Sequence, residues 1–299
     1  MKQLAILSGK GGTGKTTLVG AFSSLVENKV LADCDVDAAD LFLILEPETI
    51  EKNDFYSGRK PRVDKEKCTE CGICTELCRY DAIEDGKVDL LECERCGLCA
   101  LGCPEEAITM EDAFSGEWFI SETRYGPMIH ARLGIGEENS GKLVAEVRKV
   151  AQSIAKERKI ELIIIDGPPG IGCPVISSLA GANLALVVTE PTVAGIHDLE
   201  RLVKLAQHFD IPPMICINKY DINPAQTLQI EDYCRREDLT LVGKVPFDIA
   251  VVKAMVEKKT VMEYPCPAIQ DAIRDTWRRV EEVLNEKRTP HDPKGGGSD

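Results

Sequence analysis

The chain has 299 residues, of which 43% are hydrophobic and 29% are charged, so it is long enough for about two domains and can bury a sizeable core. Its formal net charge of −14 argues against a general nucleic-acid-binding surface, which needs an excess of lysine and arginine. A predicted strand begins at the N-terminus without a signal peptide, and no apolar run approaches the roughly 20 residues that a membrane span needs. We therefore expect a cytoplasmic protein without a membrane anchor.

A phosphate-binding loop is predicted between the first strand and the first helix. The stretch QLAIL (residues 3–7) is typical of a buried strand, and TTLVGAFSSLV (residues 16–26) is typical of a helix. The residues between them fit G-x-x-x-x-G-K-[ST], in which glycines let backbone N–H groups turn towards phosphate oxygens. Lys15 is expected to neutralise the β- and γ-phosphates and Thr16 to bind Mg²⁺. The residues expected to contact the nucleotide are Gly9, Lys10, Gly11, Gly12, Thr13, Gly14, Lys15, Thr16 and Thr17.

A glycine-rich turn that merely opens a helix is the alternative for this loop. The agreement of spacing, strand and helix disfavours it. Lys10 has no role in the pattern itself, because the phosphates already have Lys15.

Acidic residues follow the next predicted strand in VLADCDVDAADL (residues 30–41). Asp33 and Asp35 lie at the carboxyl end of this strand, where α/β sheets place their chemistry. Asp37 and Asp40 are explained equally well as residues that solvate a loop. Asp35 is therefore the acidic candidate for a catalytic role.

Eight of the thirteen cysteines form an internal repeat with a period of 25 residues. Each half has the spacing C-x₂-C-x₂-C-x₃-C, and CGIC in the first half matches CGLC in the second. This pattern resembles bacterial-type ferredoxins with two [4Fe–4S] clusters, in which each cluster takes three cysteines from one run and the fourth from the other. We expect one cluster to be bound by Cys68, Cys71, Cys74 and Cys103, and the other by Cys93, Cys96, Cys99 and Cys78.

One departure and two alternatives accompany this interpretation. Pro104 follows the last cysteine as in the ferredoxin pattern, whereas Arg79 stands at the equivalent place in the first run and leaves the shape of that loop open. A pair of four-cysteine zinc sites is disfavoured, because zinc does not need a third cysteine two residues on. A disulfide framework is disfavoured in a reducing compartment.

The cysteine-rich module spans about residues 59–112, and NDFYSGRKPRVD (residues 53–64) is interpreted as the linker that leads into it. The nucleotide-binding pattern begins before the module and resumes after it. We therefore predict a nucleotide-binding domain in two parts, residues 1–58 and 113–287, with a ferredoxin-like domain inserted at residues 59–112. The polar residues 288–299 are predicted to form a disordered tail.

Three later strands end in polar residues that fit a nucleotide site. ELIIIDGPPG (residues 161–170) is a buried strand ending in Asp166, whose carboxylate is expected to hold Mg²⁺ through water. MICIN (residues 214–218) ends in Asn218, and LVGKVPFD (residues 241–248) ends in a turn that contains Pro246 and Asp248. Because the carboxyl ends of parallel strands meet at one edge of a sheet, Asn218, Pro246 and Asp248 are expected near the base. A purely structural turn at residues 246–248 is the alternative.

GKGGTGKTT (residues 9–17) resembles the deviant Walker A loop, K-G-G-x-G-K-[ST], of the MinD/ParA-type P-loop ATPases, a superfamily that includes the nitrogenase iron protein. DCDVDAAD (residues 33–40) resembles its switch I, and DGPPGIG (residues 166–172) resembles its switch II. The resemblance covers residues 1 to about 285. With the insertion, it implies an α/β fold in which helices flank a mostly parallel sheet that carries a ferredoxin-like module.

The resemblance also implies roles for individual residues. In this superfamily the early lysine reaches across a two-fold interface to the phosphates in the partner's site, a role that falls on Lys10. Asp35 would orient or deprotonate the attacking water, and Asn218 would contact the base. The implied catalytic residues are thus Lys10, Lys15 and Asp35. ATP and Mg²⁺ would be bound by an ATP-dependent dimer, either a homodimer or a heterodimer with a paralogue.

Three features qualify the resemblance. The stretch from Asn218 to Asp221 also matches N-K-x-D, the guanine-reading motif, so GTP is an alternative to ATP. Cys173 is expected to be an ordinary buried or loop residue, although a cysteine after switch II binds a shared cluster in the nitrogenase iron protein. The predicted C-terminal helix indicates packing on the core rather than membrane binding, because its narrow apolar stripe is flanked by both charge signs. That stripe consists of Ile269, Ile273, Trp277, Val280 and Leu284.

Two functions fit these patterns. The first is an ATPase that couples nucleotide-driven dimer changes to electron transfer, or to iron–sulfur or metal-cofactor handling, with a redox or metal-cofactor protein as partner. The alternative is a MinD/ParA-like positioning or assembly switch whose clusters are structural or sensory. The insertion favours the first function, because two neighbouring clusters form an electron relay in ferredoxins.

Overall fold

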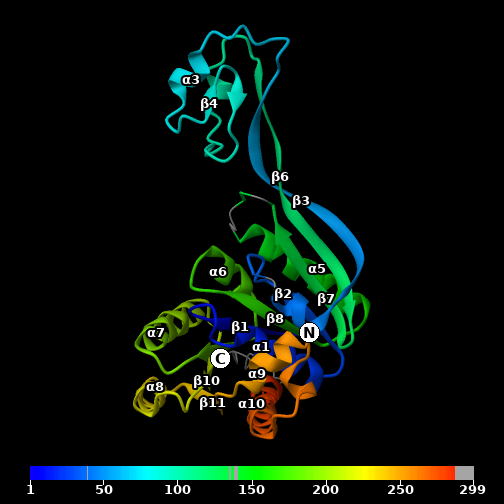
Figure 1. Cartoon of the computed structure of the whole chain (residues 1–299), viewed down its shortest axis with the longest axis vertical. Coiled ribbons are helices and arrows are strands. Elements are labelled where there is room, and N and C mark those ends of the chain that lie inside the picture. The colour runs from blue at the N-terminus through cyan, green and yellow to red at the C-terminus, as the bar shows by residue number, and fades with distance from the viewer. Residues whose placement is uncertain (39, 135, 138–140, 287–299) are drawn as a thin grey trace, which may run out of the picture. The chain divides into compact units, whose positions relative to one another are not determined.

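The computed structural model describes residues 1–38, 40–134, 136–137 and 141–286, so the predicted tail lies outside the described residues. The chain divides into two compact units (Figure 1). Unit 1 contains Met1–Lys52, Trp118–Arg132 and Asn139–Asp299, and unit 2 contains Asn53–Glu117 and Leu133–Glu138.

The main sheet has nine strands in the order β11-β10-β9-β1-β8-β2-β7-β6-β3, of which β3 and β6 have residues in both units and the others form the framework of unit 1. Neighbouring strands from β11 to β7 are parallel. These strands are β1 (Lys2–Ser8), β2 (Lys29–Asp33), β7 (Gly126–Leu133), β8 (Leu162–Pro169), β9 (Leu184–Thr189), β10 (Pro213–Asn218) and β11 (Thr240–Val245). Most of their side chains are buried, as expected for parallel strands with both faces covered.

Helices cover the sheet on both faces (Figure 1), which confirms the predicted α/β class. On one face, α1 and α10 share a core in which the rings of Phe22 and Trp277 lie 5.0 Å apart. The helices α5, α6 and α7 pack against the sheet as well. The helices of unit 1 are α1 (Lys15–Leu25), α2 (Asp40–Leu45), α5 (Lys142–Glu157), α6 (Cys173–Leu179), α7 (Val193–His208), α8 (Pro224–Arg236), α9 (Ala250–Val256) and α10 (Pro267–Glu286), with a short 3₁₀ turn at Val261–Glu263.

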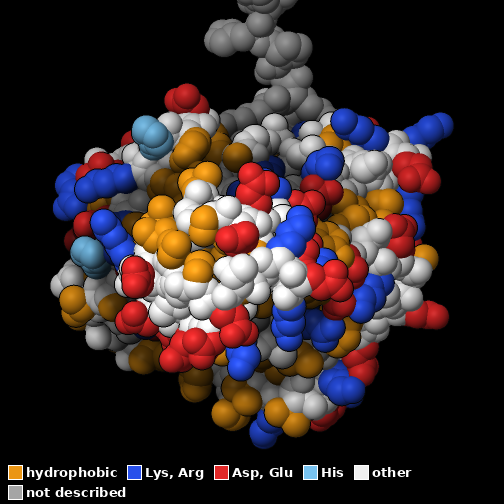
Figure 2. All heavy atoms as spheres, turned by 90° about the horizontal axis from the view of Figure 1, so that it is seen from above, with side chains coloured by type: hydrophobic (Ala, Val, Ile, Leu, Met, Phe, Trp, Pro, Cys, Tyr) orange, Lys and Arg blue, Asp and Glu red, His pale blue; other side chains and the backbone are white. Residues whose placement is uncertain are grey.

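The apolar stripe of α10 is buried, which confirms that this helix packs on the core. Its buried members include the five predicted residues Ile269, Ile273, Trp277, Val280 and Leu284. Among the described residues, no helix combines the length and apolar character needed to cross a membrane. On the face of the molecule shown in Figure 2, acidic and basic side chains are interspersed with apolar ones.

The stretch interpreted as a linker is a strand, and that interpretation was wrong. Residues 53–63 belong to β3 (Glu48–Val63), which is the sheet neighbour of β6 (Ile108–Thr123). Arg62 of β3 forms an ion pair with Glu111 of β6 at 2.9 Å, and the hydroxyl of Ser115 donates to the carbonyl of Ser57 at 3.0 Å. Side chains of β3 are largely exposed, so the sequence lacks the apolar alternation by which strands are predicted.

Unit 2 repeats its backbone conformation with the period of its cysteines. The short helices α3 (Ile73–Leu77) and α4 (Leu98–Leu101) begin 25 residues apart. Left-handed φ angles recur at the same interval, at Glu70 and Arg95, Gly72 and Gly97, and Asp81 and Glu106. The two halves also pair with each other, because the N–H of Asp64 donates to Ala107 and the N–H of Asp89 donates to Ala82. A small hairpin of β4 (Ile83–Glu84) and β5 (Lys87–Val88) completes the unit.

Truncating Trp277 should destabilise unit 1. We expect Trp277→Ala to lower the free energy of unfolding by roughly 3–5 kcal/mol, because the side chain is 8% exposed and its loss leaves a cavity against Phe22. Urea titration followed by far-UV circular dichroism measures this change. Glu281→Ala, at an exposed position of the same helix, should change the free energy by less than about 0.5 kcal/mol. Equal effects of the two substitutions would contradict the packing of α10 on the core.

Candidate functional site

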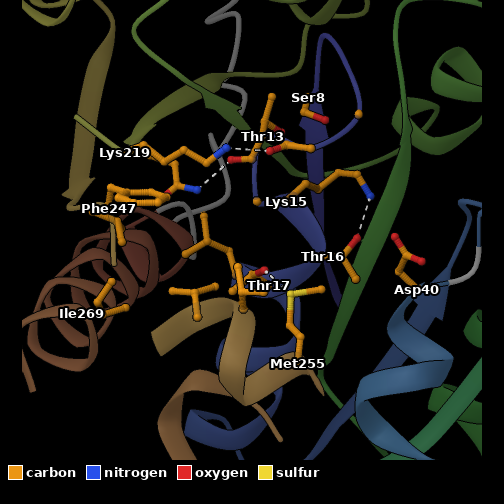
Figure 3. Close-up of a pocket in the computed structure, with 18 of the residues that line it drawn as sticks. Ser8, Thr13, Lys15, Thr16, Thr17, Asp40, Lys219, Phe247, Met255 and Ile269 are labelled. Atoms are coloured by element: carbon orange, nitrogen blue, oxygen red, sulfur yellow. Dashed lines mark hydrogen bonds between the residues drawn. The ribbon is translucent and has the colours of Figure 1, made fainter. Parts of the chain in front are cut away.

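A cavity in unit 1 lies at the carboxyl ends of the parallel strands (Figure 3). The predicted residues that line it are Gly11, Gly12, Thr13, Gly14, Lys15, Thr16, Thr17, Asp35, Asn218, Pro246 and Asp248. Gly9, Lys10 and Asp166 lie outside this lining. The structure therefore brings most of the predicted nucleotide-binding residues to one place, but it sets Lys10 apart from them.

The phosphate loop depends on a glycine immediately before α1. Gly14 has a left-handed φ of 91°, and a Cβ atom there would lie 2.1 Å from the side-chain nitrogen of Asn218. That nitrogen donates a hydrogen bond to the carbonyl of Thr13 at 2.7 Å. Only glycine combines this backbone turn with so close an approach. Asn218, at the end of β10, thereby supports the loop as well as lining the cavity.

Lys15 is neutralised by two carboxylates. Its Nζ atom forms an ion pair with Asp166 of β8 and lies 3.4 Å from Asp35. It also lies 3.3 Å from the hydroxyl of Thr16, beside which it is seen in Figure 3. Burial disfavours the charged lysine, but the carboxylates outweigh burial and raise the pKa of Lys15. The lysine is thus charged and held at the floor of the cavity.

The acids next to Lys15 have raised pKa values, and some of their oxygen atoms lack a hydrogen-bond partner in the protein. Burial and the nearby charge of Asp166 raise the pKa of Asp33 well above its usual range. Burial also raises the pKa of Asp35 to about 6, although Lys15 opposes the shift. One carboxylate oxygen of Asp33, one of Asp166 and the hydroxyl of Thr13 are buried without a hydrogen-bond partner in the protein. Such groups are costly unless a ligand, ion or water satisfies them.

Lys10 points to a carboxylate of its own chain. Its Nζ atom lies 2.6 Å from Glu190, the residue that follows β9. The other oxygen of Glu190 pairs with Lys219 at 3.0 Å, and Lys219 also donates to the carbonyl of Gly12 at 2.8 Å. Burial opposes ionisation of Glu190, but hydrogen bonds from Lys10 and Lys219 outweigh it and lower the pKa of Glu190. Glu190 is a site residue that the sequence analysis did not predict, and the one signal was its place after an apolar strand.

The far side of the cavity is apolar (Figure 3). Phe247, Met255 and Ile269 line it there, opposite the phosphate loop. The turn that carries Phe247 is fixed by Asp221, whose carboxylate accepts the N–H of Phe247 at 2.8 Å. The cavity thus has a charged end beside Lys15 and an apolar end, as a nucleotide requires.

The eight clustered cysteines line two separate cavities in unit 2. Cys68, Cys71, Cys74 and Cys103 line the first. Cys78, Cys93, Cys96 and Cys99 line the second. In the part of the chain that the structure describes, no three His, Cys, Asp or Glu side chains are grouped as a site for a metal ion. Cys173, outside both sets, is exposed at the first position of α6.

The raised pKa of Asp35 predicts how nucleotide-free stability depends on pH. The folded protein binds this proton more tightly than the unfolded chain, so the resulting stabilisation is present below about pH 4 and is lost as the pH rises through about 6. We expect Asp35→Asn, which cannot ionise, to raise the melting temperature at pH 7 and to have a smaller effect at pH 4. Scanning calorimetry without nucleotide measures both values. Asp40→Asn, at an exposed position lining the same cavity, is the control, and an equal response of the two variants would contradict the role of burial.

Comparison with known proteins identifies the family. Residues 4–261 match the CobQ/CobB/MinD/ParA nucleotide binding domain. Two uncharacterized proteins of Methanocaldococcus jannaschii are 32% and 26% identical to this chain, covering 94% and 95% of it and 97% of each relative. The septum site-determining protein MinD of Pyrococcus horikoshii, solved in complex with Mg-ADP, has the same fold, with a TM-score of 0.58 at 17% identity over 97% of this chain and 99% of that one. The chain therefore belongs to the CobQ/CobB/MinD/ParA nucleotide-binding domain family.

Proposed function

We propose that this protein is a switch ATPase of the MinD/ParA type, which dimerises when Mg–ATP fills the cavity and resets when ATP is hydrolysed. The observation that carries the proposal is the separation of the two loop lysines. Lys15 lines the cavity, whereas Lys10, five residues earlier, is turned away from it towards Glu190. A lysine that does not serve its own site is available for the site of a partner.

The charged end of the cavity suits a magnesium-bound triphosphate. Phosphate oxygens would replace Asp35 and Asp166 as partners of Lys15. Thr16 and Asp166 are the proposed Mg²⁺-holding residues, Asp166 through water. One oxygen of Asp33 and one of Asp166 are buried without a hydrogen-bond partner in the protein, and the water shell of a nearby cation would supply such partners. Asp35 is the proposed group that orients or deprotonates the attacking water.

The apolar end of the cavity suits adenine better than guanine. A guanine-reading aspartate must accept N–H groups of the base, but the carboxylate of Asp221 already accepts the N–H of Phe247. Asn218, Pro246 and Asp248 are the proposed base-contacting residues. Calorimetry with ATP and GTP side by side tests the choice, and tighter binding of GTP would overturn it.

The proposed dimer places Lys10 of each copy at the phosphates of the other. Two phosphate chains brought together repel each other, so a cation from each partner would offset that repulsion. A homodimer is the simplest assembly. A heterodimer with a paralogue is the alternative, since two full-length relatives occur in one organism.

Substituting the two lysines should have different effects. We expect Lys15→Ala to abolish tight Mg–ATP binding by the monomer. Lys10→Ala should leave that binding nearly unchanged but prevent ATP-dependent dimerisation and lower hydrolysis by on the order of 10³-fold, the value of a trans-acting arginine finger. Light scattering with Asp35→Ala, which should trap the ATP-bound dimer, gives the baseline. If Lys10→Ala in that background stays dimeric with ATP, Lys10 does not act in trans.

A second function, electron transfer or iron–sulfur or metal-cofactor handling, is proposed from unit 2. Four iron atoms keep the cysteine sulfurs of a [4Fe–4S] cluster apart, so its ligands line a cavity rather than converge on one atom. The two cysteine-lined cavities fit this requirement. Backbone N–H groups of Arg95 and Ala107 donate to the sulfurs of Cys93 and Cys103, both at 3.4 Å, as suits thiolate ligands. When bound, two such clusters would supply one-electron transfer, and the partner would be a redox or metal-cofactor protein.

The small core of unit 2 also favours bound clusters. Its buried aliphatic residues, among those that the structure describes, are Ala82, Ile83, Ala107, Ile108 and Ala113. Such a core rarely stabilises a domain of this size without metal or disulfide cross-links.

Anaerobically purified protein should contain about eight iron atoms per chain, as two [4Fe–4S] clusters require. Cys74→Ala and Cys99→Ala should each lose about half of the iron and make unit 2 more sensitive to proteolysis, because metal binding there contributes folding free energy. Metal analysis and electron paramagnetic resonance measure the clusters. Cys173→Ala, at an exposed cysteine outside both sets, should retain all the iron. Zinc in place of iron would refute the assignment.

The two functions can be told apart with one protein. If the clusters carry electrons, adding ATP should shift their reduction potentials. If they are structural or sensory, ATP-dependent dimerisation should proceed with no change in either potential.

A further inference from the structure

Glu190 forms ion pairs with two lysines, Lys10 and Lys219. It follows β9, which pairs with β1, so it reaches the start of the phosphate loop from the neighbouring strand. One carboxylate oxygen lies 2.6 Å from Lys10 and the other 3.0 Å from Lys219. The side chain of Glu190 is 13% exposed and that of Lys10 is 39% exposed. This pair is therefore partly shielded from water, yet Lys10 can leave it without crossing the core.

We propose that Glu190 is a positioning residue that holds Lys10 within its own subunit and opposes dimerisation until ATP is bound. The inference rests on the proposed function, in which Lys10 acts on the partner's phosphates. It adds a step that precedes closure, namely the transfer of each Lys10 from Glu190 of its own chain to a phosphate of the other. No covalent bond changes in this step.

Lys219 makes the transfer feasible. A half-buried carboxylate that loses its partner is costly, and that cost would keep Lys10 in place. Glu190, however, keeps Lys219 when Lys10 leaves, so its charge stays compensated. Lys219 also donates a hydrogen bond to the carbonyl of Gly12 in the phosphate loop. A phosphate bound in that loop can therefore affect Glu190 through Lys219.

The test compares Glu190→Gln with the unmodified full-length protein. Glutamine keeps the size and hydrogen-bonding capacity of the side chain but removes the charge that retains Lys10. A dimer releases two such ion pairs, so the dimer dissociation constant with Mg²⁺ and a non-hydrolysable ATP analogue should fall about twofold to thirtyfold. Sedimentation velocity over a series of protein concentrations measures this constant.

Two further variants isolate the contact with Lys10. Glu231→Gln removes a carboxylate paired with Lys244 at 2.9 Å, an ion pair of comparable exposure on α8 and β11, and should leave the dissociation constant unchanged. Lys219→Gln removes the second partner of Glu190 but keeps the first, so it should not tighten the dimer. If Glu190→Gln and Lys219→Gln tighten the dimer equally, the effect comes from a loosened loop and the inference is wrong.

Lys10→Ala distinguishes failure of this inference from failure of the proposed function. If Lys10→Ala still dimerises with the analogue, Lys10 does not act in trans and the proposed function fails with it. If Lys10→Ala is monomeric but Glu190→Gln leaves the dimer unchanged or weakens it, the function stands and Glu190 is not a restraint. The inference holds if Lys10→Ala is monomeric and Glu190→Gln tightens the dimer while Glu231→Gln and Lys219→Gln do not.

Discussion

Two buried acids, Asp33 at the end of β2 and Asp166 within β8, impose the constraint on which the nucleotide site depends. Parallel pairing makes Asp33 the register partner of Asp166, so two carboxyl groups meet side by side in the interior. Burial and repulsion by Asp166 raise the pKa of Asp33 and so favour its protonated form. Lys15 enters this cluster from the first position of α1 and pairs with Asp166 and Asp35. The lysine that would bind phosphate therefore also stabilises the acidic cluster.

This double role affects how substitutions are interpreted. Removing one partner of a buried ion pair leaves an uncompensated charge, which commonly costs about 3–5 kcal/mol. A Lys15 variant can therefore lose nucleotide binding through a disordered site as well as through a missing phosphate contact. Lys10 lies on the other side of the loop, is partly exposed and pairs with Glu190, so its substitution leaves the acidic cluster intact. Its effects report on function more directly.

Each of the three lysines at the site is already paired with a carboxylate of the chain. Lys15 is held by Asp35 and Asp166, and Lys10 and Lys219 share Glu190. In the proposed function, phosphate oxygens would compete with the carboxylates for Lys15 and Lys10. Such a site is preorganised for anions, because no lysine has to be ordered from solvent. The same competition would reduce the net affinity for the phosphate chain, since each lysine–phosphate contact replaces a lysine–carboxylate contact.

Sequence patterns predicted the parts of this arrangement that local rules determine. The loop glycines, Asp35 and Asn218 follow apolar strands, and parallel pairing brings such strand ends together. Glu190 was not assigned a role, because its importance arises from two contacts with residues 180 and 29 positions away in the chain. The strand β3 was missed for a different reason. Its pairing with β6 stabilises it despite exposed side chains, and the backbone ladder leaves no trace in the hydrophobic pattern.

The two halves of unit 2 depend on each other for their hydrogen bonds and cavities. Each half donates a backbone hydrogen bond to the other, from Asp64 to Ala107 and from Asp89 to Ala82. The cysteine sets cross over in the same way, because Cys103 lines the first cavity and Cys78 lines the second. Neither half can therefore complete its own cavity or its own hydrogen bonds. With so few buried aliphatic residues in unit 2, the two halves depend on these shared hydrogen bonds and on the cavities that their cysteines line together.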